Sequence, residues 1–373
     1  MLPPGGGRAP DAPPGTGVRR PGVAGPPATR APVAEPPLGA PERPTGVPTS
    51  DRRRFRLRWV VLLVVLLAVA YPLAVLAVAW TSLNRTAALG DGAGTPGRTY
   101  LVVGSDSRAG LTAAQKKALR TGSTAGQRTD TILLLHVPSG GGPTVLMSVP
   151  RDSYVKIPGH GSGKINSAFS IGGPKLLAQT VLQNTGIGVD DYVEIGFAGF
   201  AGMVDAVGGV QICPKRAIND RRAGLNIKKG CQQAQGATAL GYARARYSDP
   251  RGDLGRVERQ RELLAAIVSK ATSPATLVNP LRTFPLASTG AGSLTVDSNT
   301  GPLALARFVL GMRASAGPSG VSLTVPVKGN ATRAGSGSVV LWDTTRATAV
   351  FDAIKRDDTT AVKAYADRQQ AGT

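Results

Sequence analysis

The feature that most constrains this chain is an uncharged, mostly apolar run from Trp59 to Asn84. A helix of about 20 such residues is long enough to cross the hydrocarbon core of a bilayer, because each residue adds about 1.5 Å. Trp59 and Trp80 stand near the ends of the run, where tryptophan favours the membrane interface. The run therefore predicts one transmembrane helix over residues 59–80. Its length and the missing small-residue cleavage site favour a signal anchor over a removable signal peptide, although an uncleaved signal has the same pattern.

The residues before this helix predict its orientation. Five arginines precede it: Arg52, Arg53, Arg54, Arg56 and Arg58. Because cytoplasmic flanks of membrane helices are rich in positive charge, we expect the N-terminus in the cytoplasm and everything after Arg85 outside it. Residues 1–50 hold 14 of the 29 prolines and show no hydrophobic periodicity. We therefore expect residues 1–58 to form a disordered cytoplasmic tail with a basic end.

The overall charge predicts a polyanionic partner. The chain has 44 lysines and arginines against 23 acidic residues, a formal net charge of +21. Such a positive charge would suit binding to nucleic acid, to anionic lipid head groups or to phosphorylated glycans. Nucleic acid is disfavoured, because the domain is expected outside the cell, no helix-turn-helix is evident and only 5% of residues are aromatic.

The part after the membrane helix alternates between strand and helix patterns. Three apolar runs predict buried strands over residues 99–103, 131–137 and 144–149, and shorter strands are expected over 192–195, 210–212, 322–327 and 338–342. Helices are predicted over residues 174–184, 200–207, 254–270, 302–312 and 344–355. This alternation predicts an α/β fold with a central sheet flanked by helices on both faces. We expect a linker over residues 81–97, the domain over 98–357 and a polar tail over 358–373.

The segment Gly241 to Leu264 carries the strongest functional signal. In a helix starting at Leu254, Arg256 and Gln260 fall on the same stripe as the apolar residues, so they should face a cavity rather than water. The first turn of a helix also favours an anion. Arg244 and Arg246 are two residues apart, so in an extended stretch they would point the same way. These four groups predict a site for two or more phosphates; a basic surface helix paired with its own glutamates remains the alternative.

Polar residues flank the three long strands at ends where ligands bind in sheet folds of this kind. Asp106 and Arg108 follow the first strand, Asp130 leads into the second, and Arg151 follows the third. Asp106 and Asp130 could share a Mg²⁺, which prefers carboxylates together with phosphate oxygens. Each aspartate could equally serve a turn or a cap, and Arg151 could form a surface ion pair with Asp152.

Other chemistry is disfavoured. His136 and His160 have no partner serine and no metal-ligand spacing, which argues against nucleophilic triads and zinc hydrolysis. Lys164 follows a glycine-rich loop whose spacing is not that of a Walker A motif. Cys213 and Cys231 would face an oxidising compartment, where a disulfide is expected, although two buried thiols are the alternative.

Several motifs in order resemble one known family. GSDSR, RTDTILL, SVPRDSYV, GKINSAF, YARARYSD and GDLGRVERQRELL, behind a single N-terminal anchor, are similar to the LytR-CpsA-Psr family, and the Ala/Gly/Arg-rich composition suggests an actinobacterial type. The resemblance implies a membrane-anchored α/β phosphotransferase with a mixed sheet, which moves a glycopolymer from a polyprenyl-diphosphate carrier to peptidoglycan. It also implies Mg²⁺ (or Mn²⁺) and a groove for the lipid tail, for which Leu176, Leu177, Val181, Phe200 and Val204 are candidates.

The resemblance also implies roles for individual residues. Asp106 and Asp130 would bind the metal, and Asp253 would orient the arginines or the metal-bound water, or act as the base. The diphosphate would be held by Arg151, Arg244, Arg246, Arg256 and Gln260, with Arg108, Lys164, Asn166 and Arg259 as a second set. The insertion over residues 109–127 departs from the family pattern between the two aspartates. A pyrophosphatase acting on the carrier-linked diphosphate, or a non-catalytic binder of anionic wall polymer, are the alternative functions.

Overall fold

The computed structural model describes residues 50–90, 94–105, 129–245 and 253–371. Helix α1 runs over Ser50–Ser82, and its segment Arg54–Ser82 is long and apolar enough to cross a membrane, with a mean hydropathy of 2.9. Leu62, Leu66 and Leu76 on this helix are each more than half exposed, so protein does not cover them. The helix begins before the predicted start at Trp59, because the intervening arginines are good helix formers.

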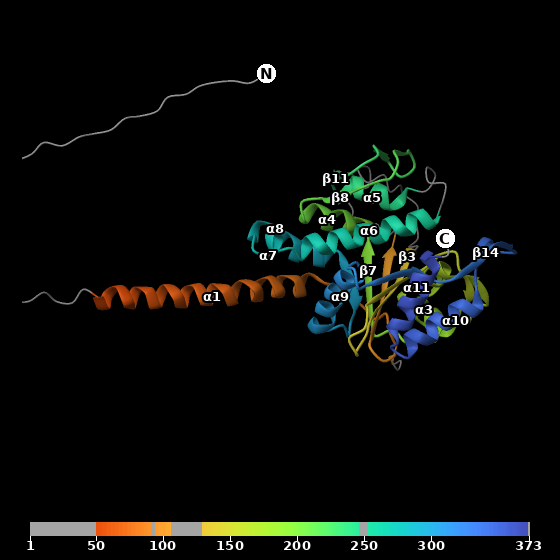
Figure 1. The fold of residues 1–373 in the computed structure, drawn as a ribbon, viewed down its shortest axis with the longest axis horizontal. Coiled ribbons are helices and arrows are strands. Elements are labelled where there is room, and N and C mark those ends of the chain that lie inside the picture. The colour runs from red at the N-terminus through yellow and green to blue at the C-terminus, as the bar shows by residue number, and fades with distance from the viewer. Residues whose placement is uncertain (1–49, 91–93, 106–128, 246–252, 372–373) are drawn as a thin grey trace, which may run out of the picture. The chain divides into compact units, whose positions relative to one another are not determined.

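A seven-stranded mixed sheet forms the centre of residues 60–373 (Figure 1). Its strands lie in the order β1 (Asn84–Thr86), β12 (Leu294–Asp297), β7 (Asp191–Gly196), β2 (Arg98–Ser105), β3 (Thr129–Val137), β4 (Val145–Val149) and β13 (Val321–Thr324). The pairs β1/β12, β7/β2 and β4/β13 are parallel, and the other neighbouring pairs are antiparallel. The predicted mixed sheet is therefore confirmed.

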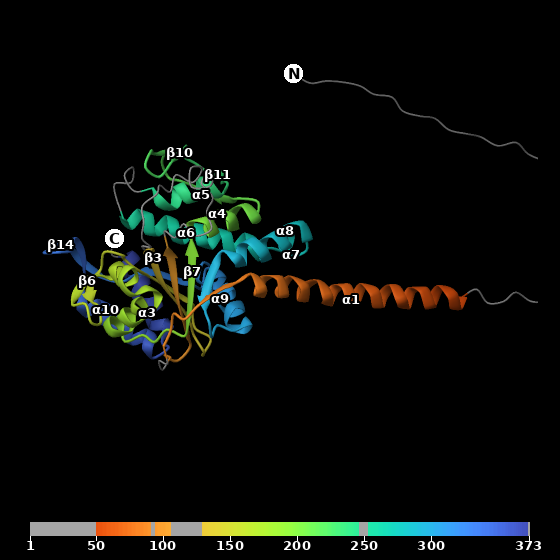
Figure 2. The ribbon, with the colours of Figure 1, turned by 180° about the vertical axis from the view of Figure 1, so that it is seen from behind.

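Both faces of the sheet are buried, which explains why the long strands are continuous apolar runs. Leu101 and Val103 of β2 pack in one core with α3 (Ile165–Thr185), α10 (Thr344–Lys355) and α11 (Thr359–Ala371). Tyr100 and Val102 point to the other face and pack in a second core with α6 (Asp253–Ala271) and α9 (Pro302–Ser315). Figure 2 shows the two groups of helices on either side of the strands.

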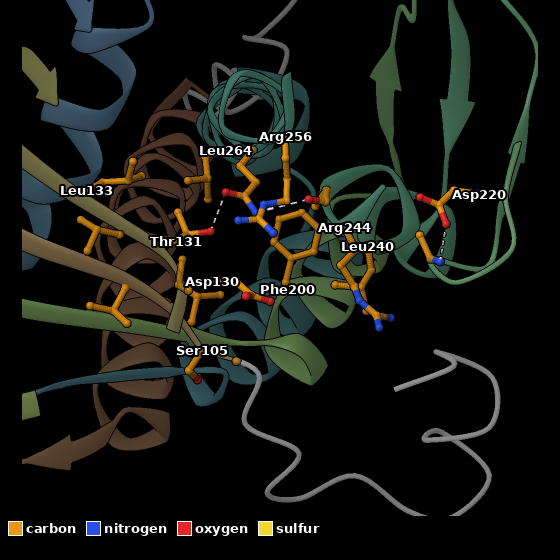
Figure 3. A pocket seen from close by; sticks show the side chains of 18 of the residues that line it. Ser105, Asp130, Thr131, Leu133, Phe200, Asp220, Leu240, Arg244, Arg256 and Leu264 are labelled. Atoms are coloured by element: carbon orange, nitrogen blue, oxygen red, sulfur yellow. Dashed lines mark hydrogen bonds between the residues drawn. The ribbon is translucent and has the colours of Figure 1, made fainter. Parts of the chain in front are cut away.

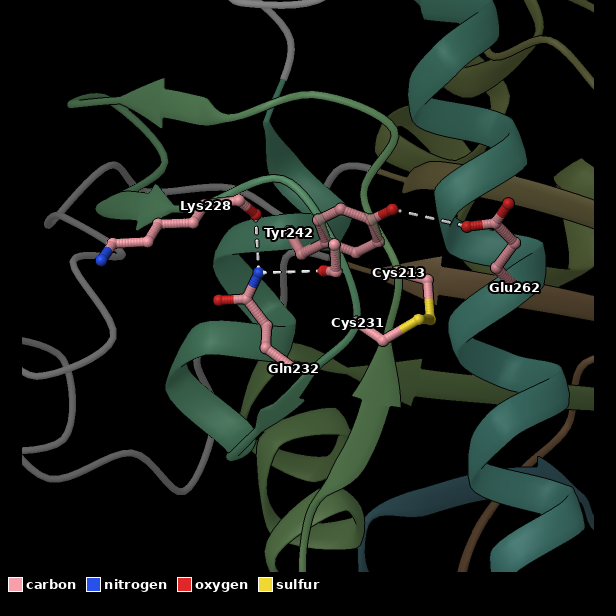
Figure 4. The surroundings of a disulfide bond; sticks show 7 residues. Cys213, Lys228, Cys231, Gln232, Tyr242 and Glu262 are labelled. Carbon is pink, nitrogen blue, oxygen red and sulfur yellow. Dashed lines mark hydrogen bonds between the residues drawn. A yellow bond between two sulfur atoms is a disulfide. The ribbon is translucent and has the colours of Figure 1, made fainter. Parts of the chain in front are cut away.

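A third layer covers the outer side of α6. It consists of α4 (Phe197–Ala206), α5 (Gly236–Arg244), the pair β8 (Val210–Ile212) and β11 (Gln232–Ala234), and the hairpin β9 (Ile218–Asp220) and β10 (Leu225–Ile227). Leu263 and Ile267 of α6 join its core, whereas Leu264 packs toward the sheet. Helix α6 is therefore covered on two sides. Cys213 and Cys231 form a disulfide within this layer (Figure 4).

Shorter elements complete the fold. Three consecutive short helices follow α6: α7 (Pro274–Leu277), α8 (Pro280–Pro285) and the π-helix Leu286–Gly290. The hairpin β5 (Tyr154–Lys156) and β6 (Ser162–Lys164) precedes α3, and the hairpin β14 (Val327–Arg333) and β15 (Gly337–Trp342) precedes α10. The predicted helix over residues 174–184 lies within α3, which starts earlier and breaks at Gly172 and Gly173.

The two ends of the domain differ from the prediction. The expected linker over residues 81–97 contains the edge strand β1, and Ala88 beyond it is buried with its N–H 2.9 Å from Asp297 Oδ2. The expected polar tail over residues 358–373 contains helix α11. Val362 and Ala366, one turn apart, are buried in the same core as α10, and this small apolar stripe is too short to stand out among polar neighbours.

Candidate active site

A cavity of about 330 Å³ lies where β2 and β7 end, beneath α4, α5 and α6 (Figure 3). Apolar side chains form much of its wall: Val102, Val103, Leu133, Ile195, Phe200, Leu240 and Leu264. Charged and polar side chains also line it: Ser105, Asp130, Thr131, Asp220, Arg222, Arg244, Arg256 and Gln260. The cavity therefore combines an apolar surface with several cations, which suits a ligand that has an apolar part and an anionic part.

Helix α6 presents polar groups to this cavity, as predicted from its pattern. Arg256 is 5% exposed and Gln260 is 9% exposed, and both line the cavity. Arg256 lies in the first turn of α6, where the N–H groups and the helix dipole add positive potential. The alternative of a basic surface helix is wrong for these two residues, because α6 is covered by the sheet on one side and by the third layer on the other.

Gln260 joins three elements at the cavity. Its Oε1 accepts a hydrogen bond from Thr131 Oγ1 of β3 at 2.7 Å, and its Nε2 donates to the carbonyl of Ala243 in α5 at 3.3 Å. A residue that holds a strand and two helices in register has a positioning role.

Arg259, one of the second set of predicted diphosphate residues, contacts the end of α5. It is 5% exposed, and its Nε donates to the carbonyl of Tyr242 at 3.2 Å while its Nη2 donates to the carbonyl of Ala245. These acceptors belong to the C-terminal end of α5, where a cation is favourable. Arg259 is absent from the cavity lining within the described part of the chain. Its contacts therefore fit a role in anchoring α5 to α6.

Arg244, the last residue of α5, also lines the cavity. The prediction of an extended stretch is wrong at this position, because Gly236–Arg244 is helical. Small residues allow that helix to pack closely: a Cβ on Gly236 would lie 2.4 Å from the carbonyl oxygen of Ala201 in α4. Arg246, the other half of the predicted pair, lies outside the described residues.

Asp130 of the cavity belongs to a series of connected ion pairs. Arg151 Nη1 binds Asp130 Oδ1, and Arg151 Nε lies 3.5 Å from Asp152 Oδ2. Lys164 Nζ lies 2.8 Å from Asp152 Oδ1. Burial raises the pKa of Asp152, but the hydrogen bond from Lys164 and the positive charges of Arg151, Lys164 and Arg256 outweigh it and hold that pKa below its usual value.

These contacts place several predicted residues around one polar region. Arg151 binds the cavity residue Asp130 as well as Asp152, so it is more than the surface ion pair considered as an alternative. Lys164 and Asn166 are at the outer end: Lys164 binds Asp152, and the backbone N–H of Asn166 donates to the carbonyl of Arg151 at 3.2 Å. Both are absent from the cavity lining among the described residues.

Four predicted site residues are outside what the structure describes. Asp106, Arg108 and Arg246 lie in undescribed segments, and so does the side chain of Asp253, whose backbone begins α6. Among the described residues, no group of three or more His, Cys, Asp or Glu side chains is close enough to hold a metal. Ser105, directly before Asp106, pairs with Thr129, directly before Asp130, after a shift of the β2/β3 register between Gly104 and Ser105.

The residues predicted to hold a lipid tail lie in different parts of the domain. Phe200 lines the cavity. Leu176, Leu177 and Val181 of α3 do not line the cavity and are buried in the core with α10 and α11. Val204 of α4 is buried in the core of the third layer.

The prediction missed Asp220 and Arg222, which reach the cavity from the segment between the two cysteines. The density of cations in that segment was the one available signal.

Comparison with known proteins identifies the family. The profile of the LytR_cpsA_psr family matches residues 85–356. The chain belongs to this family. The expected family resemblance is thus confirmed over nearly all of the domain that carries the cavity.

Individual relatives agree with this assignment. The chain is 49% identical over 264 residues to "Probable cell wall biosynthesis protein LcpB" of Corynebacterium glutamicum, covering 70% of this chain and 62% of that relative. It is 38% identical over 152 residues to "Polyisoprenyl-teichoic acid--peptidoglycan teichoic acid transferase TagU" of Oceanobacillus iheyensis, covering 39% of this chain and 47% of that relative. Its fold matches the LytR-Csp2A-Psr enzyme from Actinomyces oris with a TM-score of 0.54 and 22% identity, over 73% of this chain and 96% of that one.

Proposed function

We propose that this protein transfers a glycopolymer from a polyprenyl-diphosphate carrier to peptidoglycan. The observation that carries the proposal is the cavity itself, where Arg244 and Arg256 share one space with a wall of apolar side chains. A polyprenyl diphosphate combines the same two kinds of surface. Two relatives, named as a probable cell wall biosynthesis protein and as a polyisoprenyl-teichoic acid–peptidoglycan teichoic acid transferase, support the same reaction class.

The arginines suit phosphoryl transfer. A diphosphate brings concentrated negative charge, and guanidinium groups neutralise it while binding two oxygens at once. In the proposed step, a hydroxyl oxygen of peptidoglycan forms a bond to the sugar-linked phosphorus, and the bond from that phosphorus to the bridging oxygen breaks. Polyprenyl phosphate leaves with the electron pair, and Arg244 and Arg256 stabilise its charge. The hydroxyl proton passes to a base, for which Asp253 at the start of α6 is the candidate.

We expect a divalent metal, Mg²⁺ or Mn²⁺, at this site. Asp130 lines the cavity, and Ser105, directly before Asp106, pairs with Thr129 in the sheet, so the insertion after Asp106 does not separate the two strand ends. Mg²⁺ needs only one or two carboxylates when substrate phosphates complete its shell. Asp130 and Asp106 would hold the ion, which would supply charge neutralisation at the phosphates when bound. We expect a chelator to abolish transfer and added Mg²⁺ to restore it.

The proposal includes the location of the reaction. Helix α1 would be the membrane anchor, with the N-terminus in the cytoplasm because of its arginine-rich flank. The domain would then meet peptidoglycan and the lipid carrier outside the membrane. Fusing a reporter that is active only in the cytoplasm to either end of the chain tests this orientation: activity is expected at the N-terminus alone.

The function is tested with the detergent-solubilised chain and a labelled lipid-diphosphate glycan. Incubation with peptidoglycan is expected to give labelled peptidoglycan and polyprenyl phosphate. Release of free glycan phosphate at the same rate with and without peptidoglycan would instead support the pyrophosphatase. Binding of wall polymer with neither product would support the non-catalytic binder. Mass spectrometry of the wall linkage after depletion of the protein would identify the glycopolymer.

A further inference from the structure

The disulfide closes a segment that is unusually basic. Between Cys213 and Cys231 there are six cations and one acidic residue, Asp220. The six are Lys215, Arg216, Arg221, Arg222, Lys228 and Lys229, and all are exposed. Asp220 is only 4% exposed, and its Oδ1 accepts the N–H groups of Arg222 and Ala223, both at 3.0 Å. The one acidic side chain therefore stabilises the turn. We call the segment between Cys213 and Cys231 the basic loop, and its outer surface is cationic.

The basic loop is held in a defined shape. Ile212, Ile218, Leu225 and Ile227 are buried in the core shared with α5 and α6, in strands where the intervening residues face outward. The disulfide joins the two ends, and Gln232 Nε2 donates to the carbonyls of Lys228 at 2.7 Å and Gly230 at 3.3 Å. Figure 4 shows the Lys228 side chain extended away from the disulfide. A fixed frame of this kind lets an anion bind with little ordering of the backbone.

The loop is continuous with the cavity. Asp220, Arg222 and Ala223 line the cavity, and the remaining cations lie on the same closed segment. A ligand whose diphosphate is held in the cavity can therefore extend over the loop. The charge of Lys215 acts on Glu262 of α6, so we attribute the ligand contacts to the other cations.

The composition of the loop indicates what it recognises. It contains no aromatic residue, and its exposed apolar residues are limited to Ala217 within this described segment. Stacking on sugar rings or bases needs aromatic rings, and interfacial membrane binding needs a buried apolar surface or aromatic anchors. The loop offers charge alone, repeated over several positions, and such a surface favours a polymer with repeated anionic groups.

We infer that the basic loop is a docking surface for the polymer part of the substrate and that this polymer is anionic, with phosphate or carboxylate groups along its length. The inference rests on the proposed function for the identity of the ligand. The cavity would hold the diphosphate, and the loop would hold the first charged units beyond it. The protein would then favour carriers with long anionic polymers over carriers with short or neutral glycans.

The test uses the detergent-solubilised full chain and a fourfold variant, R216Q/R221Q/K228Q/K229Q, which spares the cavity residue Arg222 and the disulfide. The control variant, K175Q/K328Q/R333Q/R356Q, removes the same charge from exposed positions on α3, on β14 and after α10. The probe is poly(glycerol phosphate), with dextran as the neutral polymer. Wild type and control are expected to bind the anionic probe about tenfold more tightly than the loop variant at low salt, and salt should reduce the difference. Equal binding by both variants would overturn the inference.

Two further measurements separate the remaining outcomes. With a carrier-linked disaccharide that lacks charged units, the loop variant is expected to transfer at the wild-type rate, while its KM for a phosphate-rich carrier rises. If wild type transfers neither substrate, the proposed function fails, but the binding comparison still decides the inference. Vesicles of phosphatidylglycerol and of phosphatidylcholine test a membrane role. Loss of vesicle binding by the loop variant, with unchanged binding of poly(glycerol phosphate), would assign the surface to lipid and overturn the inference.

Discussion

The side chain of Gln260 accepts a hydrogen bond from Thr131, with 2.7 Å between Oε1 and Oγ1, and this bond ties α6 to β3 at the wall of the cavity. Because Gln260 also donates to α5, one side chain sets the spacing of three cavity walls. Stability and activity should therefore both depend on it, and the two effects can be separated.

Replacing Thr131 by Val or Gln260 by Leu is expected to lower the free energy of unfolding by about 1 kcal/mol each, with more for Gln260 because Ala243 also loses a partner. Because the two residues share a bond, the double variant should cost less than the sum of the single variants. Denaturant unfolding of all four proteins checks this. Strict additivity would show that the bond does not contribute.

Arg244→Ala is expected to reduce transfer about 100-fold with little change in stability, since Arg244 is half-buried at the cavity and lies at the end of α5. Transfer from a labelled lipid-diphosphate glycan measures the first effect, and the thermal midpoint measures the second. Arg244→Lys should recover part of the rate, because it restores the charge without the two-pronged geometry. Wild-type transfer by Arg244→Ala would remove this residue from the diphosphate site.

In contrast to Arg244→Ala, Arg259→Ala is expected to lower the stability of the protein. The buried guanidinium donates to the carbonyls of Tyr242 and Ala245, so its removal leaves two buried acceptors at the end of α5. We expect a loss of about 2 to 4 kcal/mol in the free energy of unfolding. A variant that is fully stable but cannot transfer would assign Arg259 to the substrate instead.

A buried histidine should make stability depend on pH. His136 is fully buried between Thr99 Oγ1 and Asp357 Oδ1, each 2.9 Å from the ring. Burial lowers its pKa below the ordinary value of 6.5, although the bond to Asp357 raises it in part. The folded state therefore takes up the proton less readily than the unfolded state does. Neutral His136 therefore contributes fully to the free energy of unfolding above pH 6.5, the ordinary pKa of the unfolded state. The contribution is lost as the pH falls from 6.5 toward the pKa of the folded state.

Unfolding of wild type and His136→Gln between pH 7.5 and about 5 measures this effect. The wild-type free energy of unfolding should fall on acidification, and the slope should be smaller in the variant. His160→Gln is the matched control, because His160 is the other histidine and lies exposed in a turn. Equal slopes for all three proteins would exclude His136 as the source.

The disulfide should stabilise the third layer. The two cysteines are 18 residues apart, and closing a loop of that length contributes about 3 kcal/mol. The double variant Cys213→Ser/Cys231→Ser is expected to lower the thermal midpoint, and a reducing agent should have the same effect on the wild type but none on the variant. An unchanged midpoint on reduction would mean that the layer is held by its apolar core alone.

The sequence by itself determined the long elements and which face of α6 is buried. Continuous apolar runs such as Leu101 to Val103 and Ile132 to Leu135 marked the central strands, because a strand buried on both faces has no polar side. Arg256 and Gln260 could be placed inside, because their one-turn spacing coincides with the apolar stripe of a helix. Helix α10 was predicted at its observed bounds, Thr344–Lys355, and the structure adds that the Asp343 side chain caps it by accepting the N–H of Arg346.

The tertiary structure decided what short segments and shared contacts become. Strand β1 forms by pairing with β12, and α11 is buried by packing against β13 and α10. Neither segment has enough hydrophobic periodicity of its own to be predicted from the sequence. Arg256 and Arg259 were both candidates for the phosphate site, with Arg259 in the second set, and the tertiary structure shows that Arg256 lines the cavity while Arg259 donates to carbonyls at the end of α5. Periodicity in a sequence reports which face of an element is buried, whereas the neighbour that buries it is set by contacts between residues distant along the chain.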